Sequence, residues 1–344
     1  MQDYRRPNKR RIAAVLNGEL PDRVPNFEVL VDNPTFGHVM GRHVAGGHTL
    51  ANIDPADYIE FVSRIGQDVV GMCFYDSPFR CVDPARQLGP LDFKIKSRGD
   101  LARVKVTDLS HLEPQFALLD RYARSVEGSD IGLFVLLGSF FTDTYTTIFG
   151  FEHFMVLVHE DRDLVEEVLE QYTAYYVSMA ERLVDYPLTF FYVGDDLAYK
   201  TSTLVRPQLL REIWVPRMQR VFELALRKRI PIVFHSDGNI EALIPDLLEM
   251  GVCALNPIEP YGMDIRKIKK CYGRHLALIG NMDVGGALSH GTPEQVRAEA
   301  RQLVDDVGQD GGFVLASCHS ITPNVKPENF LAMVDTAQTY GIYS

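Results

Sequence analysis

The sequence predicts an α/β fold of the (β/α)8 type, a TIM barrel, because short β-branched or aromatic runs alternate with longer stretches of helical spacing. Eight such runs occur, and polar residues follow each one where the strand would end. Parallel strands that are joined by crossover helices close most naturally into a barrel. The predicted strands cover residues 24–31, 69–75, 132–137, 188–194, 231–235, 254–258, 276–280 and 312–317.

The helical stretches between these strands carry recognisable start and stop signals. Thr292-Pro293-Glu294 offers an N-cap followed by a first-turn proline. Gly251 and Gly341 stand where glycine commonly ends a helix. The predicted helices cover residues 151–186, with an interruption near 160–163, and 206–229, 240–250, 293–307 and 327–340.

The connection after the second strand, residues 77–130, is too long for an ordinary βα loop. We expect it to hold a helix and an inserted hairpin around residues 91–95, which would cover the active site. No linker divides the chain, so one domain of residues 1–344 is expected. An open doubly wound sheet is the alternative, but no glycine-rich phosphate motif follows the first strand, so no nucleotide cofactor is expected.

The composition, 46% hydrophobic and 24% charged, is typical of a soluble globular protein. A net charge of −11 argues against nucleic-acid binding, and the basic run at residues 5–11 is interpreted as the exposed face of a first helix rather than a polyanion site. No apolar run reaches the ~18 residues of a membrane span, and the start is polar. We therefore expect a cytoplasmic protein with five reduced cysteines.

The strand ends hold the main functional signal, because the carboxyl ends of barrel strands converge on one mouth, where active sites of this fold lie. A purely structural protein has little reason to concentrate ionisable residues there. The residues at these ends are Glu28, Asp76, Ser139, Asp195, Asp196, His235, Ser236, Asp237, Asn256, Glu259, Asn281, Asp283, Cys318 and His319.

Two of these clusters suggest proton transfer or cation binding. Asp195 and Asp196 are adjacent carboxylates, so their repulsion can raise the pKa of one of them; alternatively Asp196 caps a turn and Asp195 faces the amides of the neighbouring strand. His235 can bind a metal or shuttle a proton, and Asp237 is either its companion or the N-cap of the next helix. The expected catalytic residues are Asp195, Asp196, His235 and His319, and the expected substrate-binding residues are Glu28, Asp76, Asn256 and Asn281.

A zinc site is a further hypothesis. Cys318 precedes His319 at the end of the last strand, and a thiolate there would complete a site with His235. The spacing is not a compact zinc signature, and a cysteine on a strand is commonly a small buried hydrophobic residue. Arg80 and Arg86 in the insert either bind substrate carboxylates or lie on the surface.

Six stretches of the sequence resemble the uroporphyrinogen decarboxylase superfamily, and they occur in the same order over nearly the whole chain. They are GELPDRVP (18–25), VGDDL (193–197), VFHSDGN (233–239), GVCALNP (251–257), LIGNMDV (278–284) and SCHSITPNVKPEN (317–329). The resemblance implies a (β/α)8 barrel. It also implies one of two activities: decarboxylation without a cofactor, or methyl transfer to or from a corrinoid carried on a separate protein.

The N-terminal region argues against porphyrinogen decarboxylation. True decarboxylases carry there a block resembling RQAGRYLPEY, whose arginines hold the substrate carboxylates. Residues 26–41 read NFEVLVDNPTFGHVMG, without arginine, so a substrate with eight carboxylates would meet Glu28 and Asp32 instead. Asp76 and His319 do resemble the functional aspartate and the late histidine of the decarboxylases.

The methyltransferase branch fits better. Its thiol-dependent members hold zinc with His-x-Cys and a distant Cys. Here His235-Ser236-Asp237 has aspartate in place of the cysteine of His-x-Cys, and Cys318 stands near the position of the distant cysteine. Oxygen ligation gives a harder site that suits an oxygen-bound substrate. We therefore expect an O-demethylase-like methyltransferase that acts on a small methyl ether with a corrinoid partner protein, and zinc held by His235, Asp237 and Cys318. The alternatives are decarboxylation of a carboxylated substrate and a non-catalytic small-ligand-binding barrel; a homodimer is left open.

Overall fold

The structure, a computed structural model, describes residues 4–44, 48–50, 53–82 and 88–343. Seven parallel strands form one curled sheet in the order β1-β5-β6-β7-β8-β9-β10, so the predicted α/β barrel architecture is confirmed. Each predicted run from the second onward becomes one of these strands. Their bounds are β1 Val69–Phe74, β5 Gly132–Gly138, β6 Phe190–Gly194, β7 Ile232–His235, β8 Val252–Asn256, β9 Ala277–Met282 and β10 Phe313–Ser317.

The first predicted strand, residues 24–31, is extended but pairs only at isolated bridges beside β10. On that side Leu315 N donates to Pro25 O at 2.9 Å. Towards β1 the Gln67 side chain stands in for a strand partner: it accepts from the segment's backbone, and its Nε2 donates to Val69 O at 3.0 Å. Pro25 has no N–H to give to a ladder, which is one reason why this apolar run is not a regular strand.

Helix α1 (Lys9–Leu16) covers the amino end of the barrel. Lys9 N donates to Asp130 O, just before β5, and Asn8 N donates to Asp68 Oδ1, just before β1. Ile12, Val15 and Leu16 of α1 join the cluster inside the barrel, which also contains inward-facing residues of the strands such as Phe134, Tyr192 and Ile279. A second, larger cluster fills the space between the sheet and the outer helices.

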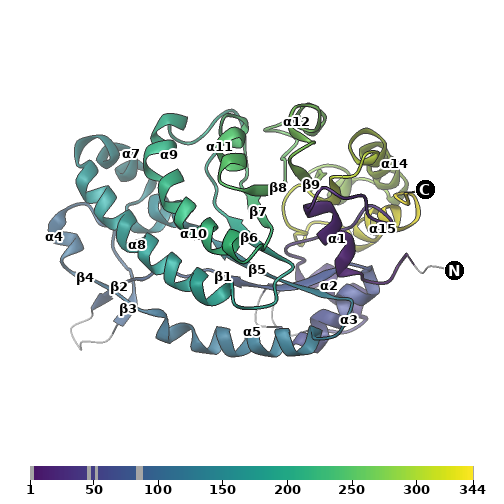
Figure 1. The fold of residues 1–344 in the computed structure, drawn as a ribbon, viewed down its shortest axis with the longest axis horizontal. Coiled ribbons are helices and arrows are strands. Elements are labelled where there is room, and N and C mark those ends of the chain that lie inside the picture. Colours follow the sequence, from purple (N-terminus) through teal and green to yellow (C-terminus); the bar gives the residue numbers. More distant parts are fainter. Residues whose placement is uncertain (1–3, 45–47, 51–52, 83–87, 344) are drawn as a thin grey trace.

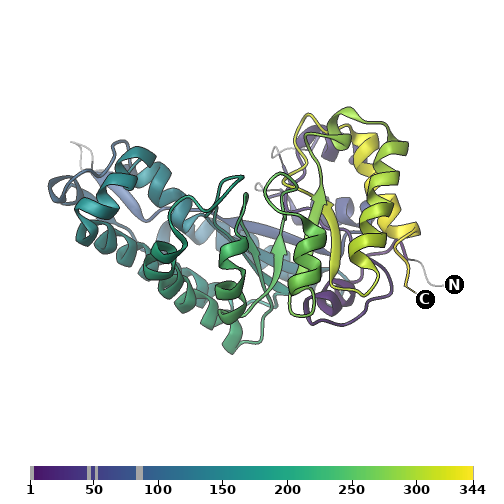
Figure 2. The same cartoon turned by 90° about the horizontal axis from the view of Figure 1, so that it is seen from above.

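The outer helices surround the sheet, and both ends of the chain lie at the same end of the molecule (Figures 1 and 2). The predicted helix at 151–186 is two helices, because Asp161 caps the second through Leu164 N. Thr292 caps α14 as predicted, and the structure adds a capping box with Gln295. In the described part of the chain no helix is long and apolar enough to cross a bilayer. The helices are α2 Asn33–Met40, α3 Pro55–Ile65, α4 Arg98–Leu101, α5 Glu113–Val126, α6 Phe140–Asp143, α7 Phe151–Glu160, α8 Arg162–Leu183, α9 Pro207–Ile213, α10 Val215–Arg227, α11 Ile244–Glu249, α12 Ile265–Tyr272, α13 Ala287–His290, α14 Pro293–Leu303 and α15 Pro327–Thr339.

The insert after β1 forms a small antiparallel sheet of β2 (Phe79–Val82), β3 (Leu88–Pro90) and β4 (Val104–Val106) in the order β3-β2-β4. It lies beside α4 and α8, far from the chain ends (Figure 1). The hairpin predicted around residues 91–95 is wrong in position: this segment is not a strand, and Ile95 N donates to Ile148 O instead. Arg86 lies outside the described residues.

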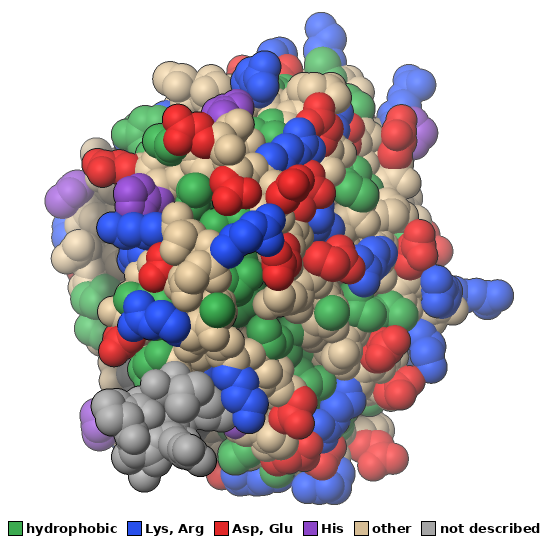
Figure 3. Space-filling view, turned by 90° about the vertical axis from the view of Figure 1, so that its left-hand side faces the viewer, with side chains coloured by type: hydrophobic (Ala, Val, Ile, Leu, Met, Phe, Trp, Pro, Cys, Tyr) green, Lys and Arg blue, Asp and Glu red, His purple; other side chains and the backbone are tan. Residues whose placement is uncertain are grey.

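Charges of both signs are interspersed over the outer surface near α4, α7 and α8 (Figure 3). Many of them are paired: Arg98 with Glu167 at 2.6 Å and Arg220 with Glu170 at 2.6 Å are examples. Such exposed pairs contribute little to stability individually. Their relevance is that most arginines on this side already have an acidic partner.

Candidate active site

His235 ends β7, and its imidazole orientation is fixed by two neighbours. Its Nδ1 lies 2.8 Å from Asn256 Oδ1 and 3.1 Å from the Tyr192 hydroxyl. Asn256 Nδ2 donates to Ile279 O at 3.2 Å, and the Tyr192 hydroxyl donates to Asn256 Oδ1 at 2.6 Å. Because an amide oxygen only accepts, His235 Nδ1 carries the proton, and Nε2 presents its lone pair on the other side of the ring.

Two carboxylates face this Nε2 atom. Asp196 Oδ1 lies 3.8 Å away and Asp237 Oδ1 lies 3.7 Å away. Within the described ranges this is the only group of three or more potential metal-ligating side chains, with ligand atoms all within 4.8 Å of one another. Asp237 Oδ1 is buried and has no hydrogen-bond partner. A buried carboxylate oxygen without a partner is costly, so the arrangement fits a cation between the three side chains.

His319 adds a second imidazole next to this cluster. Its Nε2 lies 3.4 Å from Asp237 Oδ2, and half of its side chain is exposed. The hydrogen bond to Asp237 raises the pKa of His319, and the charges of Asp237, Asp196 and Glu259 act in the same direction. Burial opposes ionisation of Asp237, but the hydrogen bond from His319 and the charge of that imidazole hold the pKa of Asp237 below the usual value. The structure therefore brings together Asp196, His235, Asp237 and His319.

Asp195 does not lie in this group, contrary to expectation. Its carboxylate is 1% exposed and accepts from Phe141 N at 2.9 Å, Thr142 N at 2.9 Å and Trp214 Nε1 at 2.7 Å. Burial raises the pKa of Asp195 to about 6, against the lowering effect of these donors. The side chain therefore anchors the start of α6. This is similar to the alternative interpretation of Asp195, in which its carboxylate faces backbone amides of the neighbouring strand.

Cys318 also lies outside the cluster. It is buried, and its Sγ accepts from Val284 N at 3.4 Å. Burial raises the pKa of this thiol to about 12, which disfavours the thiolate that zinc requires. Of the expected ligands, His235 and Asp237 lie together with Asp196 in a group that could hold a metal ion, and Cys318 is not part of this group.

Three expected substrate-binding residues are buried, with polar groups bonded within the protein. Glu28 accepts from Ser317 N at 2.7 Å and from Ser317 Oγ at 2.6 Å, which ties residues 24–31 to β10. Asn256 supports His235, as described above. Asn281 donates from Nδ2 to Ile258 O at 2.9 Å and is 7% exposed. Being at a strand end does not ensure that a side chain points into the mouth.

Asp76, the fourth, belongs to a separate cluster that joins the insert to α8. Its carboxylate accepts from Arg80 at 2.7 Å and from the Tyr175 hydroxyl at 2.6 Å, and it lies 2.8 Å from His111 Nε2. Arg80, a candidate for binding substrate carboxylates, is therefore already paired. Sequence reasoning missed His111 and Tyr175 because they come from helical segments and not from strand ends. It also missed Tyr192, whose hydroxyl in an otherwise apolar strand was the available signal.

Four large aromatic side chains are exposed on the segments that follow the carboxyl ends of the strands. They are Tyr75 after β1, Phe151 at the start of α7, Tyr199 after β6 and Tyr261 after β8. We call them the rim aromatics.

A parallel α/β barrel with polar and ionisable side chains beyond the carboxyl ends of its strands is the arrangement of TIM-barrel enzymes. The sequence matches the uroporphyrinogen decarboxylase (URO-D) family over residues 87–340, and the chain belongs to this family. It is 31% identical over 140 residues to a uroporphyrinogen decarboxylase of Thioalkalivibrio sulfidiphilus, covering 40% of this chain and 38% of the relative. It is 25% identical over 254 residues to a uroporphyrinogen decarboxylase of Neisseria meningitidis serogroup C, covering 70% of this chain and 68% of the relative.

A solved structure has the same fold over nearly the whole chain. It is a methyltransferase from Methanosarcina mazei, with a TM-score of 0.70 and 20% identity, covering 96% of this chain and 98% of that one. The barrel is therefore shared by a decarboxylase family and by a protein described as a methyltransferase.

Proposed function

We propose that the protein transfers a methyl group from a small methyl ether to the cobalt of a corrinoid that a partner protein carries. The observation that carries this proposal is the Asp196, His235 and Asp237 cluster with its unpartnered buried oxygen. A polar methyl ether of modest size has no electrostatic conflict with these carboxylates. The likeness of the whole barrel to a methyltransferase supports the same choice between the two activities.

The three side chains fit a divalent metal ion such as zinc, because they offer one imidazole nitrogen and two carboxylate oxygens. Bound there, the ion would supply Lewis acidity to the ether oxygen. The protein's own contribution is orientation. Asn256 and Tyr192 hold the His235 ring so that Nε2 faces the carboxylates, and Asp237 N donates to Asp196 Oδ1 at 3.0 Å, which fixes the second carboxylate.

His319 is placed to supply the proton that the reaction needs. When the methyl–oxygen bond breaks, its electron pair stays on oxygen, and the methyl group bonds to cobalt through an electron pair of the reduced metal. The oxygen then takes a proton and leaves as an alcohol or phenol. His319 is half exposed, lies beside the cluster and pairs with Asp237, so it can hold this proton in the mouth.

The rim aromatics suit the docking of a corrinoid-bearing partner. Transfer to cobalt requires the macrocycle to approach the mouth, and flat apolar rings provide contacts for it. Tyr199 follows β6 and Tyr261 follows β8, with β7 between these two strands, and Lys200 Nζ stands 5.2 Å from the centre of the Tyr261 ring.

Porphyrinogen decarboxylation is the second candidate, and the family itself favours it. Decarboxylation of a porphyrinogen requires cationic side chains that bind the carboxylates of the substrate. In the described residues 26–41 there is no arginine, and the carboxylates of the cluster would repel such a substrate. Asp76 would also have to give up Arg80, His111 or Tyr175 to act on it.

The experiment combines metal analysis with a transfer assay. The purified protein, supplied with zinc, is mixed with a reduced corrinoid protein and a panel of methoxylated aromatics, and methylation of the corrinoid is followed by absorbance. His235→Ala should abolish transfer, whereas His275→Ala, at an exposed histidine after α12, should not. The proposal is wrong if no ether methylates the corrinoid while uroporphyrinogen is converted to coproporphyrinogen.

A further inference from the structure

We infer that the amino-terminal face of the barrel carries a second binding site, for a small organic anion with an apolar body. A cavity of about 840 Å³ lies there, between α1, the end of α5 and the segments that lead into β5, β6 and β7. His235 and its cluster stand at the other, carboxyl end of the strands. The inference is therefore independent of the proposed methyl transfer.

The cavity combines cationic side chains with an apolar wall. Lys9 and Arg10 come from α1, Arg124 from α5, and Arg229 from the turn before β7, while Pro187 and Leu188 supply accessible apolar surface. Within the part of the chain that the structure describes, no hydrogen bond or ion pair of these four cationic side chains is present. One acid, the exposed Glu127, also lines the cavity.

Unpaired cations are notable in this chain, whose net charge is −11. Neighbouring basic residues have carboxylates: Arg11 bonds Asp22 and Asp68, and Arg182 bonds Glu113 at 2.6 Å. Arg10, Arg124 and Arg229 are exposed and Lys9 is half-buried, and four cations that line one cavity make its electrostatic potential positive. A cavity lined this way therefore lowers the energy of a bound anion.

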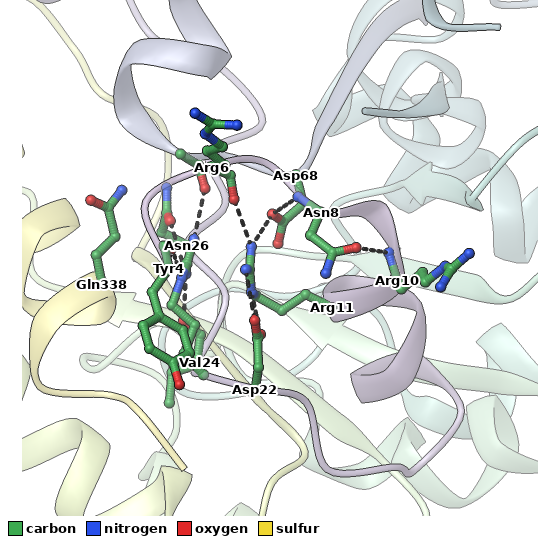
Figure 4. A network of polar contacts seen from close by, with 12 residues as sticks. Tyr4, Arg6, Asn8, Arg10, Arg11, Asp22, Val24, Asn26, Asp68 and Gln338 are labelled. Carbon is green, nitrogen blue, oxygen red and sulfur yellow. Dashed lines mark hydrogen bonds and ion pairs between the residues drawn. The ribbon is translucent and has the colours of Figure 1, made fainter. Parts of the chain in front are cut away.

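The two cations of α1 are held in place by a network that does not use their charges. Arg11 donates to Asp22 Oδ1 at 2.6 Å and to Asp68 Oδ1 at 2.5 Å, and Asn8 N donates to the same Asp68 oxygen at 2.8 Å. Figure 4 shows Arg11 within this network and the Arg10 side chain turned away from it. In this network Asp22 and Asp68 are bonded to Arg11 and Asn8 and not to Lys9 or Arg10, and α1, which carries Lys9 and Arg10, is held in position.

Size and lining define the ligand class. The volume falls within the range of small-molecule sites, which are mostly apolar with a few placed polar groups. Lysine and arginine bind carboxylates and phosphates, and Pro187 and Leu188 provide apolar surface for a hydrocarbon or ring. The ligand is thus an organic carboxylate or phosphate monoester.

Titration calorimetry with matched probes tests the inference. Octyl phosphate and octanoate differ only in the anionic group and distinguish the two sources, while 1-octanol has the same body without charge. We expect saturable binding of at least one anion, at least about tenfold tighter than 1-octanol, and weakened by added salt. If 1-octanol binds equally well, or no anion binds saturably, the inference is wrong.

Variants locate the site. Arg124→Gln with Arg229→Gln should weaken anion binding by about tenfold or more, and Glu127→Gln should strengthen it. Arg274→Gln removes the same charge from an exposed arginine outside the cavity and should change nothing. His235→Ala should also leave binding intact, because the mouth is not involved. The assignment is overturned if His235→Ala loses anion binding. It is also overturned if the double variant, with unchanged thermal unfolding, binds the anion as tightly as the wild type.

Discussion

His235 Nδ1 lies 2.8 Å from Asn256 Oδ1, on the side of the imidazole opposite the carboxylates of Asp196 and Asp237. This contact decides which ring nitrogen is available. Without it the ring could rotate or change tautomer, and Nε2 would no longer present a lone pair to the two carboxylates.

Substitution of Asn256 should therefore weaken metal binding although Asn256 is not a ligand. We expect Asn256→Ala to lower zinc affinity by about 10- to 100-fold, the usual effect of losing an outer-shell partner. Tyr192→Phe should have a smaller effect, because Asn256 still accepts from His235. Competition with a chromophoric chelator measures both values, and zinc affinity that is unchanged in Asn256→Ala would contradict the role of this contact.

Addition of zinc should raise the thermal stability of the protein. A ligand at 100 times its dissociation constant stabilises the folded state by about 2.7 kcal/mol when it does not bind the unfolded chain. The melting temperature should therefore rise with zinc and fall back with a chelator. His235→Ala and Asp237→Asn should show no shift, and His275→Ala should behave as the wild type; an equal shift in all four proteins would place the zinc elsewhere.

The sequence predicts seven of the strands well because a continuous apolar run bounded by turn residues is a local property of the chain. The run at 24–31 has the same pattern, but its pairing depends on Gln67 and β10, which are distant in the chain. Likewise the insert is predictable from its length, whereas the position of its strands depends on tertiary contacts such as that of Ile95 with Ile148.

The candidate site is predictable as a set of strand ends but not in its division of roles. Asp195 and Asp196 are adjacent in sequence, yet only Asp196 faces His235, because successive side chains leave the chain on different sides. Cys318 and His319 divide in the same way. Which of two neighbours enters the mouth depends on packing partners such as Trp214 and Val284, and these contacts are long-range.

Glu28 should make the protein less stable as pH rises. Burial raises its pKa to about 8, above the usual 4.5, so the folded protein keeps a proton that the unfolded chain releases. Stability from this group is fully present below pH 4.5 and declines as pH rises towards 8. Glu28→Gln keeps the shape and an acceptor for Ser317 N, and its amide N–H can donate to Ser317 Oγ, but the side chain cannot ionise. Between pH 5 and pH 9 the melting temperature of the variant should rise relative to that of the wild type. Parallel plots of melting temperature against pH for the two proteins would show that Glu28 does not titrate in this range.

Asp195→Ala should destabilise the fold rather than remove a catalytic group. The substitution leaves buried donors of Phe141, Thr142 and Trp214 without an acceptor, and each such loss costs about 1–3 kcal/mol. We therefore expect about 3 kcal/mol or more of lost unfolding free energy. Trp214 is the only tryptophan of the chain and contacts Asp195 directly, so its fluorescence reports both local loosening and global unfolding in urea. Methyl transfer by the folded fraction should persist. If unfolding is unchanged and transfer is abolished, Asp195 acts in the chemistry, and the structural role given to it here is wrong.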